Sequence, residues 1–208
     1  MIHIFIVDDH NIVRKGLVKL LENTGNIKIT GEAANYKELQ QADLQKTEIL
    51  ILDIGLPDKS GIDILKDIKV KYPKLNVLIL SMYPEDQYAI RLIKSGASGF
   101  VSKDSAPDEL LDAIQKVYRG ETYVSHKLAA HLIDYIDSKD HNPLHFQLSD
   151  REFEVFIKFA GGAAIKEIAE ELKISPKTVS TYKLRVQQKL SLKTNVDFAL
   201  YAKQHNLL

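Results

Sequence analysis

The sequence contains no cysteine and no tryptophan, and only 2 of its 208 residues are methionine. The absence of cysteine excludes a disulfide framework, a thiol nucleophile and a zinc–thiolate site. No apolar run approaches the roughly 18 residues that a membrane-spanning helix needs. The N-terminal stretch IHIFIV leads directly into two acids, so no signal peptide is expected. We therefore expect a cytoplasmic protein with no membrane partner.

The formal net charge of 0 hides an uneven distribution of charges. The first 145 residues carry a small acidic excess, and the rest of the chain carries a small basic excess. No acid occurs between Glu171 and Asp197. A solvated helix face usually mixes charges of both signs, whereas an unmixed basic cluster is typical of a face that binds an anionic partner. The cations between those two acids are Lys173, Lys177, Lys183, Arg185, Lys189 and Lys193.

Apolar, β-branched runs alternate with helical periodicity over about the first 120 residues. Strands rich in apolar residues on both faces, separated by helices, predict βαβ crossovers. The first domain is therefore expected to be α/β, a doubly wound five-stranded parallel sheet. Strands are expected at 2–8, 28–33, 48–54, 76–81 and 99–102. Helices are expected around 12–21, 36–44, 61–71, 85–95 and 107–118.

The pattern changes after residue 122, where this first domain is expected to end. A linker is expected over 123–146, with a helix at about 125–136 and a polar, turn-prone segment at 138–145. The remainder, 147–208, is helical in pattern throughout and predicts a second, all-α domain. Its helices are expected at 148–160, 165–175, 176–190 and 194–204.

Acids stand at the ends of two expected strands in the first domain. Asp8 and Asp9 follow the first strand, and Asp53 follows the third, while Ser81 and Lys103 follow the fourth and fifth. The carboxyl ends of parallel strands meet at one edge of the sheet, where ligands bind. An isolated Asp at a strand end is usually a turn former. Converging carboxylates instead need a cation, and hard oxygen ligands suit Mg²⁺. A metal there can bridge to a phosphoryl oxygen and leave Asp53 as the nucleophile.

Four motifs in this region resemble the receiver domain of bacterial response regulators over about residues 1–120. They are VDDH (7–10), LDIGLPDKSG (52–61), LS (80–81) and GFVSK (99–103). The resemblance implies a fold of five parallel strands and Mg²⁺-dependent phosphoryl transfer from a sensor histidine kinase. It also implies that Asp53 is the phosphoacceptor, and that Asp8, Asp9, Asp53 and the backbone carbonyl of Gly55 hold the metal.

The resemblance further assigns Ser81 as the switch hydroxyl, Phe100 as the switch aromatic and Lys103 as the lysine that faces the phosphate. At two positions of this site, a side-chain group that could take part in the chemistry is absent. Phe100 has no hydroxyl with which to hydrogen bond, and Gly55 has no side chain that could orient or block an attacking water.

The second domain shows the pattern of a helix-turn-helix. Ser149 and Glu152 have the spacing of a capping box, and Ser175 followed by Pro176 predicts the start of the third expected helix. That helix is basic and rich in hydroxyls, as expected of one that enters the major groove. The segments LSDREFEV, IKEIAEEL, ISPKTVSTY and KLSLKTN resemble the LuxR-type helix-turn-helix over about residues 146–208.

The two resemblances together identify the whole chain as similar to the NarL/FixJ family of response regulators. The family pattern implies that the helix at 176–190 recognises double-stranded promoter DNA and that the last helix mediates dimerisation. Ala163 and Ala164 depart from this pattern, which usually has a basic or polar residue and a small hydroxyl. The implied base-facing residues are Ser180, Thr181 and Leu184, and the other implied DNA contacts are Lys177, Thr178, Lys183 and Arg185.

We expect a transcription factor whose DNA binding and dimerisation are controlled by phosphorylation of Asp53, with RNA polymerase as a further possible partner. One alternative is a regulator that binds DNA without phosphorylation, through a constitutive dimer. Another is a phosphoaspartyl hydrolase that uses the same acids and metal. Such enzymes usually carry an acid two residues after the nucleophile, and Gly55 occupies that position. We therefore do not expect an enzyme.

Overall fold

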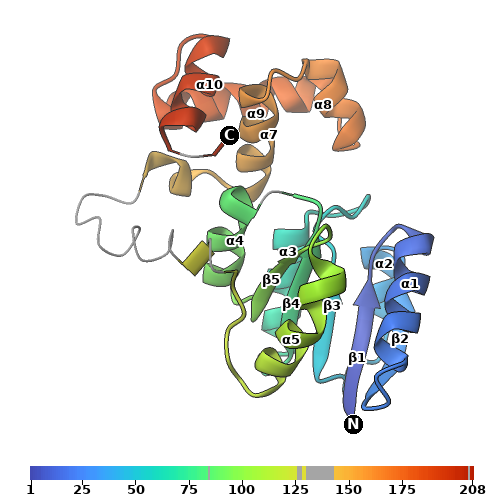
Figure 1. Cartoon of the computed structure of the whole chain (residues 1–208). Coiled ribbons are helices and arrows are strands. Elements are labelled where there is room, and N and C mark those ends of the chain that lie inside the picture. The colour runs from blue at the N-terminus through green and yellow to red at the C-terminus, as the bar shows by residue number, and fades with distance from the viewer. Residues whose placement is uncertain (84, 126–127, 130–142, 206) are drawn as a thin grey trace. The chain divides into compact units, whose positions relative to one another are not determined.

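The computed structural model describes residues 1–83, 85–125, 128–129, 143–205 and 207–208 (Figure 1). The chain divides into two compact units, residues 1–133 and 134–208. Within the described ranges, no helix combines the length and the apolar character that crossing a membrane requires. The helix expected at about 125–136 lies largely outside the described residues, of which Leu128 and Ala129 are helical.

The first unit alternates strands and helices, as expected (Figure 1). The helix expected at 36–44 ends earlier, because Ala42 adopts an extended backbone conformation. The strands are β1 Ile2–Val7, β2 Ile27–Ala33, β3 Ile49–Leu52, β4 Asn76–Ser81 and β5 Gly99–Ser102. The helices are α1 Asn11–Glu22, α2 Tyr36–Gln41, α3 Gly61–Lys71, α4 Glu85–Lys94 and α5 Ala106–Tyr118.

The five strands form one parallel sheet in the order β2-β1-β3-β4-β5. The direction of winding reverses between β1 and β3, so right-handed crossovers place α1 on the opposite face from α2, α3 and α4. Apolar residues of α1 and α5 pack in one core cluster with Ile4, Ile51 and Leu78 of the sheet. The other face is buried as well, and includes Leu50 and Phe100. The loops that follow β1 and β3 therefore lie next to each other at the carboxyl edge of the sheet.

The second unit is helical throughout its described part (Figure 1). The 3₁₀-helix η1, in a segment expected to be linker, precedes four α-helices. The helix expected at 165–175 ends at Glu171, because Lys173 takes a left-handed conformation with φ 52° and turns the chain toward Pro176. The elements are η1 Leu144–Gln147, α7 Asp150–Ala160, α8 Ile165–Glu171, α9 Pro176–Leu190 and α10 Asn195–Gln204.

Helix caps position α7 and α9 as the sequence predicts. The Glu152 amide donates to Ser149 Oγ at 3.3 Å, and Glu152 Oε2 accepts from the Ser149 amide at 2.7 Å, which completes the capping box. The Thr178 amide donates to Ser175 Oγ at 3.0 Å. Apolar side chains of all four α-helices form the interior of the unit, so the polar face of α9 is left at the surface. The fully buried residues include Phe153, Phe156, Ile168, Val179, Val186 and Phe198.

Candidate functional site

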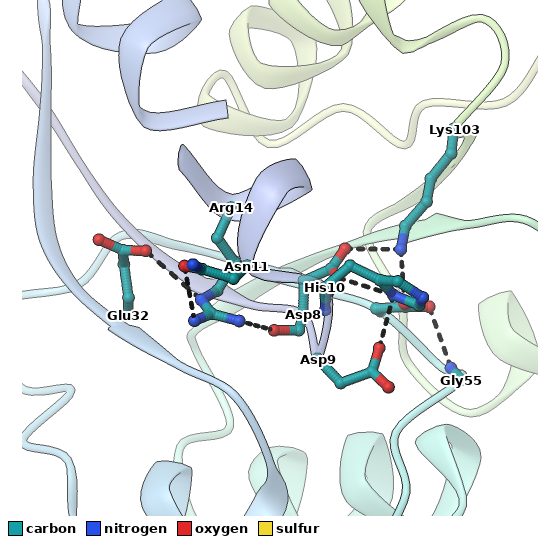
Figure 2. A network of polar contacts seen from close by, with 9 residues as sticks. Asp8, Asp9, His10, Asn11, Arg14, Glu32, Gly55 and Lys103 are labelled. Carbon is teal, nitrogen blue, oxygen red and sulfur yellow. Dashed lines mark hydrogen bonds and ion pairs between the residues drawn. The ribbon is translucent and has the colours of Figure 1, made fainter. Parts of the chain in front are cut away.

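Three carboxylates and one ammonium meet at the carboxyl edge of the sheet, after β1, β3 and β5 (Figure 2). Lys103 Nζ lies 2.6 Å from Asp53 Oδ2 and 2.6 Å from Asp8 Oδ2. Asp8 and Asp53 are only 1% and 4% exposed. Two buried carboxylates repel each other, and the ammonium between them offsets that repulsion. The structure thus brings together three residues that sequence analysis had placed at separate strand ends.

Asp9 and His10 complete the acidic group. His10 Nδ1 lies 2.7 Å from Asp9 Oδ1, and the His10 amide donates to Asp8 Oδ1 at 2.8 Å. Possible ligand atoms of Asp8, Asp9, His10 and Asp53 all lie within 4.8 Å of one another. The His10 side chain is 66% exposed, so it lies at the open side of the cluster. The sequence signal for His10 was only its adjacency to the two acids.

Burial sets the proton affinity of the two central groups. Burial raises the pKa of Asp53 above its ordinary value, because the interior disfavours the charged carboxylate more than Lys103 and the Gly55 amide favour it. Burial alone would lower the pKa of Lys103, but the charges and hydrogen bonds of Asp53 and Asp8 outweigh it and raise that pKa. Lys103 is therefore protonated at neutral pH, and its charge favours the ionised form of Asp53.

The carboxylate oxygens fit a hard divalent cation. Asp8 Oδ2 and Asp9 Oδ1 are buried and accept no hydrogen bond of normal geometry, although Lys103 Nζ lies 2.6 Å from the first and His10 Nδ1 lies 2.7 Å from the second. Buried carboxylate oxygens ordinarily find donors, so these two have free capacity for a ligand. Mg²⁺ prefers oxygen ligands of this kind.

The loop between β3 and α3 is held against Asp53 at one end and against α2 at the other. The Gly55 amide donates to Asp53 Oδ1 at 3.0 Å. Asp58 Oδ1 and Oδ2 accept from the Tyr36 and Lys37 amides, each at 3.0 Å, which tethers the loop to the start of α2. A Cβ on Gly61 would lie 2.2 Å from Ile54 Cα, so only glycine allows α3 to begin this close to the loop. Sequence analysis had not anticipated the Asp58 tether.

The two expected switch residues lie on neighbouring strands. Ser81, the last residue of β4, is fully buried, and its Oγ accepts from the Tyr83 amide at 3.1 Å. Phe100 of β5 is also fully buried, and β4 and β5 pair with Ile79 opposite Phe100. The Lys103 amide donates to the Ser81 carbonyl at 2.9 Å, which joins the end of β4 to the residue that contacts Asp53. The phenyl ring at position 100 is therefore in an inward, buried position.

The second candidate site is the polar face of α9. Lys177, Ser180, Thr181 and Arg185 are exposed, and Leu184 is 55% exposed although it is apolar. Cations, hydroxyls and one apolar side chain thus lie together on the exposed face of this helix. This combination of charge, hydroxyl and methyl groups suits the phosphates and base edges of a DNA groove.

Several of the side chains that are expected to contact DNA form hydrogen bonds within the second domain. Ser180 Oγ donates to the Pro176 carbonyl and Thr181 Oγ1 to the Lys177 carbonyl, each at 3.0 Å. Hydroxyls held in this way still offer oxygen lone pairs outward. Lys183 Nζ donates to Asn195 Oδ1 at 2.6 Å and lies over the ring of Phe159. Thr178 is half-buried at the first turn of the helix.

Lys189, at the other end of α9, has a structural partner. Its Nζ donates to Glu152 Oε2 at 2.6 Å and to the Gln147 carbonyl at 3.1 Å. Burial alone would raise the pKa of Glu152, but Lys189 and the Ser149 amide outweigh it and lower that pKa. The basic cluster that the sequence predicts is thus divided between Lys189, which ties α9 to α7, and cations that remain on the exposed face.

Family models match both units. Residues 4–115 match the response regulator receiver domain, and residues 147–202 match the LuxR family of bacterial regulatory proteins. The response regulator GacA of Pseudomonas viridiflava is 30% identical over 210 residues, covering 100% of this chain and 98% of GacA. The oxygen regulatory protein NreC of Staphylococcus carnosus is 33% identical over 213 residues, covering 99% and 98% of the two chains.

Solved structures agree with this similarity along the whole chain. RcsB from Salmonella enterica serovar Typhimurium, bound to the promoter rprA with the phosphomimetic BeF3⁻, aligns with a TM-score of 0.63 and 27% identity. The alignment covers 98% of this chain and 99% of RcsB. A structure of two RcsB dimers on two parallel DNAs aligns with a TM-score of 0.60 and 29% identity, covering 97% and 98% of the two chains.

Proposed function

Because the chain belongs to the NarL/FixJ-type response regulators, which join a receiver domain to a LuxR-type DNA-binding domain, we propose that phosphorylation of Asp53 controls its binding to promoter DNA. Proteins of this family are transcription regulators rather than enzymes, so the hydrolase alternative is set aside. The observation that carries the proposal is the buried Asp53 carboxylate, ion-paired with Lys103 beside the Asp8–Asp9 pair.

Asp53 accepts the phosphoryl group from a phosphohistidine of a sensor histidine kinase. One Asp53 oxygen attacks phosphorus, the P–N bond breaks, and its electron pair stays on the imidazole nitrogen, which takes up a proton. Lys103 Nζ, 2.6 Å from Asp53 Oδ2, then exchanges this contact for a phosphoryl oxygen. Asp8, Asp9, Asp53 and the Gly55 carbonyl would hold Mg²⁺, which would supply positive charge to phosphoryl oxygens.

The switch begins at Ser81. Its hydroxyl hydrogen donates to a phosphoryl oxygen, while its oxygen, which accepts from the Tyr83 amide, links that amide to the same movement. The β4–α4 loop therefore moves with Ser81. Phe100 is already buried, so its ring holds the inward position by packing alone, without the hydrogen bond that a hydroxyl would add.

DNA recognition takes place on α9, which enters the major groove. Lys177, Lys183 and Arg185 neutralise phosphates, and the Thr178 hydroxyl hydrogen bonds to a phosphate oxygen. Ser180 and Thr181 approach base edges, and Leu184 packs against a thymine methyl group. Lys183 first has to leave Asn195, so its contribution is smaller than that of Lys177, which is exposed.

The active form is a homodimer on two half-sites. Val196 and Leu200, one turn apart on α10, are 64% and 61% exposed and form an apolar strip suited to a second copy of the chain. A DNA-bound dimer then acts on transcription through RNA polymerase, by contact or by exclusion.

The proposal is tested with the full-length chain. Acetyl phosphate and Mg²⁺ should label the wild type and leave Asp53→Asn unlabelled, as read by gel mobility and intact mass. The DNA probe is a duplex that the BeF3⁻-treated wild type selects from a random library. Fluorescence anisotropy should show BeF3⁻ tightening binding at least about tenfold, a coupling of roughly 1.4 kcal/mol, and no response in Asp53→Asn.

The opposite result has a definite meaning. If Asp53→Asn binds the selected duplex as tightly as the BeF3⁻-treated wild type, DNA binding is independent of phosphorylation. The alternative of a constitutive dimer would then replace the proposal.

A further inference from the structure

Arg14, in the second turn of α1, contacts the backbone of an acidic-site residue (Figure 2). Its Nη1 donates to the carbonyl oxygen of Asp8 at 2.6 Å. This carbonyl lies just after β1, where the chain leaves the sheet. The Arg14 side chain is 14% exposed, so the guanidinium is largely withdrawn from water and its contacts are screened little.

The guanidinium is itself held in place from two elements. Arg14 Nε lies 3.5 Å from Glu32 Oε2 on β2, and Nη2 donates to Asn11 Oδ1 at 3.4 Å. The Asp8 amide donates to the Ala33 carbonyl of β2 at 3.2 Å. Both backbone polar groups of Asp8 are therefore fixed, one by β2 directly and one by Arg14. A planar, forked cation suits this arrangement better than a flexible ammonium.

The turn that Arg14 anchors carries the acidic pair. Asp8 Oδ1 accepts from the His10 amide at 2.8 Å, so the side chain and the backbone of Asp8 belong to one hydrogen-bonded turn. The buried carboxylates of Asp8 and Asp53 have Lys103 between them to offset their repulsion, and releasing the Asp8 carbonyl would remove one of the contacts that fix Asp8 in this arrangement. The contact is to a backbone atom, so Arg14 acts on the site without touching the reacting atoms.

We propose that Arg14 is a positioning residue for phosphoryl transfer, which holds the Asp8 carbonyl and so sets where the Asp8 and Asp9 carboxylates stand relative to Asp53. The inference rests on the proposed function of the acidic site. Helix α1 would then contribute to the Mg²⁺ affinity of the site as well as covering one face of the sheet.

Charge and position predict opposite effects on Mg²⁺ affinity. Removing a cation near three acids makes the local potential more negative, which on its own tightens Mg²⁺ binding. Releasing the Asp8 turn disperses the ligands, which weakens binding. A weaker affinity in a variant that lacks the Arg14 charge therefore indicates positioning and cannot result from the change of charge.

The experiment compares Arg14→Gln, Arg14→Lys and Glu32→Gln with Lys15→Gln, a control that removes one exposed cation from the same helix. Calorimetry gives the Mg²⁺ Kd, acetyl phosphate gives the labelling rate at saturating Mg²⁺, and urea gives the unfolding midpoint. Arg14→Gln should weaken the Mg²⁺ Kd about tenfold, as loss of an outer-shell partner does. Arg14→Lys should recover part of the loss, and Lys15→Gln should match the wild type.

Other results would overturn the positioning role of Arg14, the proposed function, or both. An Arg14→Gln chain with wild-type or tighter Mg²⁺ affinity overturns the positioning role. If Arg14→Gln does not fold, Glu32→Gln decides, because it leaves the guanidinium in place with Asn11 as its remaining support; unchanged Mg²⁺ affinity there overturns the role as well. A wild type that binds Mg²⁺ but takes no phosphoryl group overturns the proposed function. A wild type that binds no Mg²⁺ overturns both.

Discussion

The ammonium of Lys103 lies 2.6 Å from Asp53 Oδ2, and both side chains are buried at the carboxyl edge of the sheet. Lys103→Met should leave Asp53 and Asp8 without their counter-ion. Breaking a buried pair in this way costs about 3–5 kcal/mol. We expect that loss of unfolding free energy in EDTA and a partial recovery in millimolar Mg²⁺, measured by urea denaturation. A Lys103→Met chain as stable as the wild type in EDTA would contradict the counter-ion role.

Gly61 allows α3 to begin against the loop that carries Gly55. In Gly61→Ala the new Cβ would lie 2.2 Å from Ile54 Cα, and backbone atoms cannot yield as a flexible side chain does. We expect a loss of about 1–3 kcal/mol or more in unfolding free energy. Gly16→Ala is the matched control, since nothing lies within 4 Å of its Cβ in the middle of α1. That change should stabilise the chain by roughly 0.5–1 kcal/mol.

Ala164 is the N-cap of α8 and has no side-chain oxygen to accept from the helix. Half of a capping box is already present, because Glu167 Oε2 accepts from the Ala164 amide at 2.7 Å. Ala164→Ser should supply the other half and stabilise the second domain by about 1 kcal/mol. Ser149→Ala, at the complete box of α7, should cost a similar amount. Equal urea midpoints for Ala164→Ser and the wild type would show that the cap is not limiting.

Lys177 and Lys189 lie on the same helix and should differ in their effect on DNA binding. Lys177 is exposed, whereas Lys189 is paired with Glu152. Lys177→Gln should reduce the slope of log K against log salt by about 0.9, the value for one lost phosphate contact. Lys189→Gln should keep the wild-type slope and lower the stability of the domain. Anisotropy titrations of the selected duplex at several salt concentrations measure both slopes, and equal slopes for the two variants would contradict this division.

The lowered pKa of Glu152 gives the second domain an acid-sensitive stability. A carboxyl group with a folded pKa below its unfolded value, about 4.3, contributes stability above that value. The contribution is lost as the pH falls through the folded pKa. The stability of the wild type should therefore fall on acidification below about pH 4 more steeply than that of Glu152→Gln. Urea titrations followed by amide signals of α7 measure this, and parallel pH profiles would argue against the Glu152–Lys189 link.

The convergence of Asp8, Asp53 and Lys103 was predictable from sequence, because the carboxyl ends of parallel strands share one edge. The capping box at Ser149 was predictable for a different reason, since it depends only on residues three apart. Both rest on local patterns or on the topology that repeated strands and helices impose.

Contacts that depend on how helices pack were not predictable. The pairing of Lys189 with Glu152 requires the placement of α9 against α7, and no spacing in the sequence encodes it. Arg14 reaches a backbone carbonyl, which has no residue identity to search for. The early end of α8 depends on the left-handed conformation of Lys173. A glycine at this position would have predicted that conformation, whereas a lysine does not.

The acidic edge of the sheet also bears on how the chain matures during synthesis. Asp53 and Lys103 are 50 residues apart, so the growing polypeptide carries the acceptor carboxylate well before its counter-ion emerges. Pairing of distant parallel strands is a slow step in folding. Under the proposed function, Asp53 has its counter-ion beside it only after β5 has joined β4 and brought Lys103 to the site. The complete acidic site therefore forms only once the strands that carry Asp53 and Lys103 are assembled in one sheet.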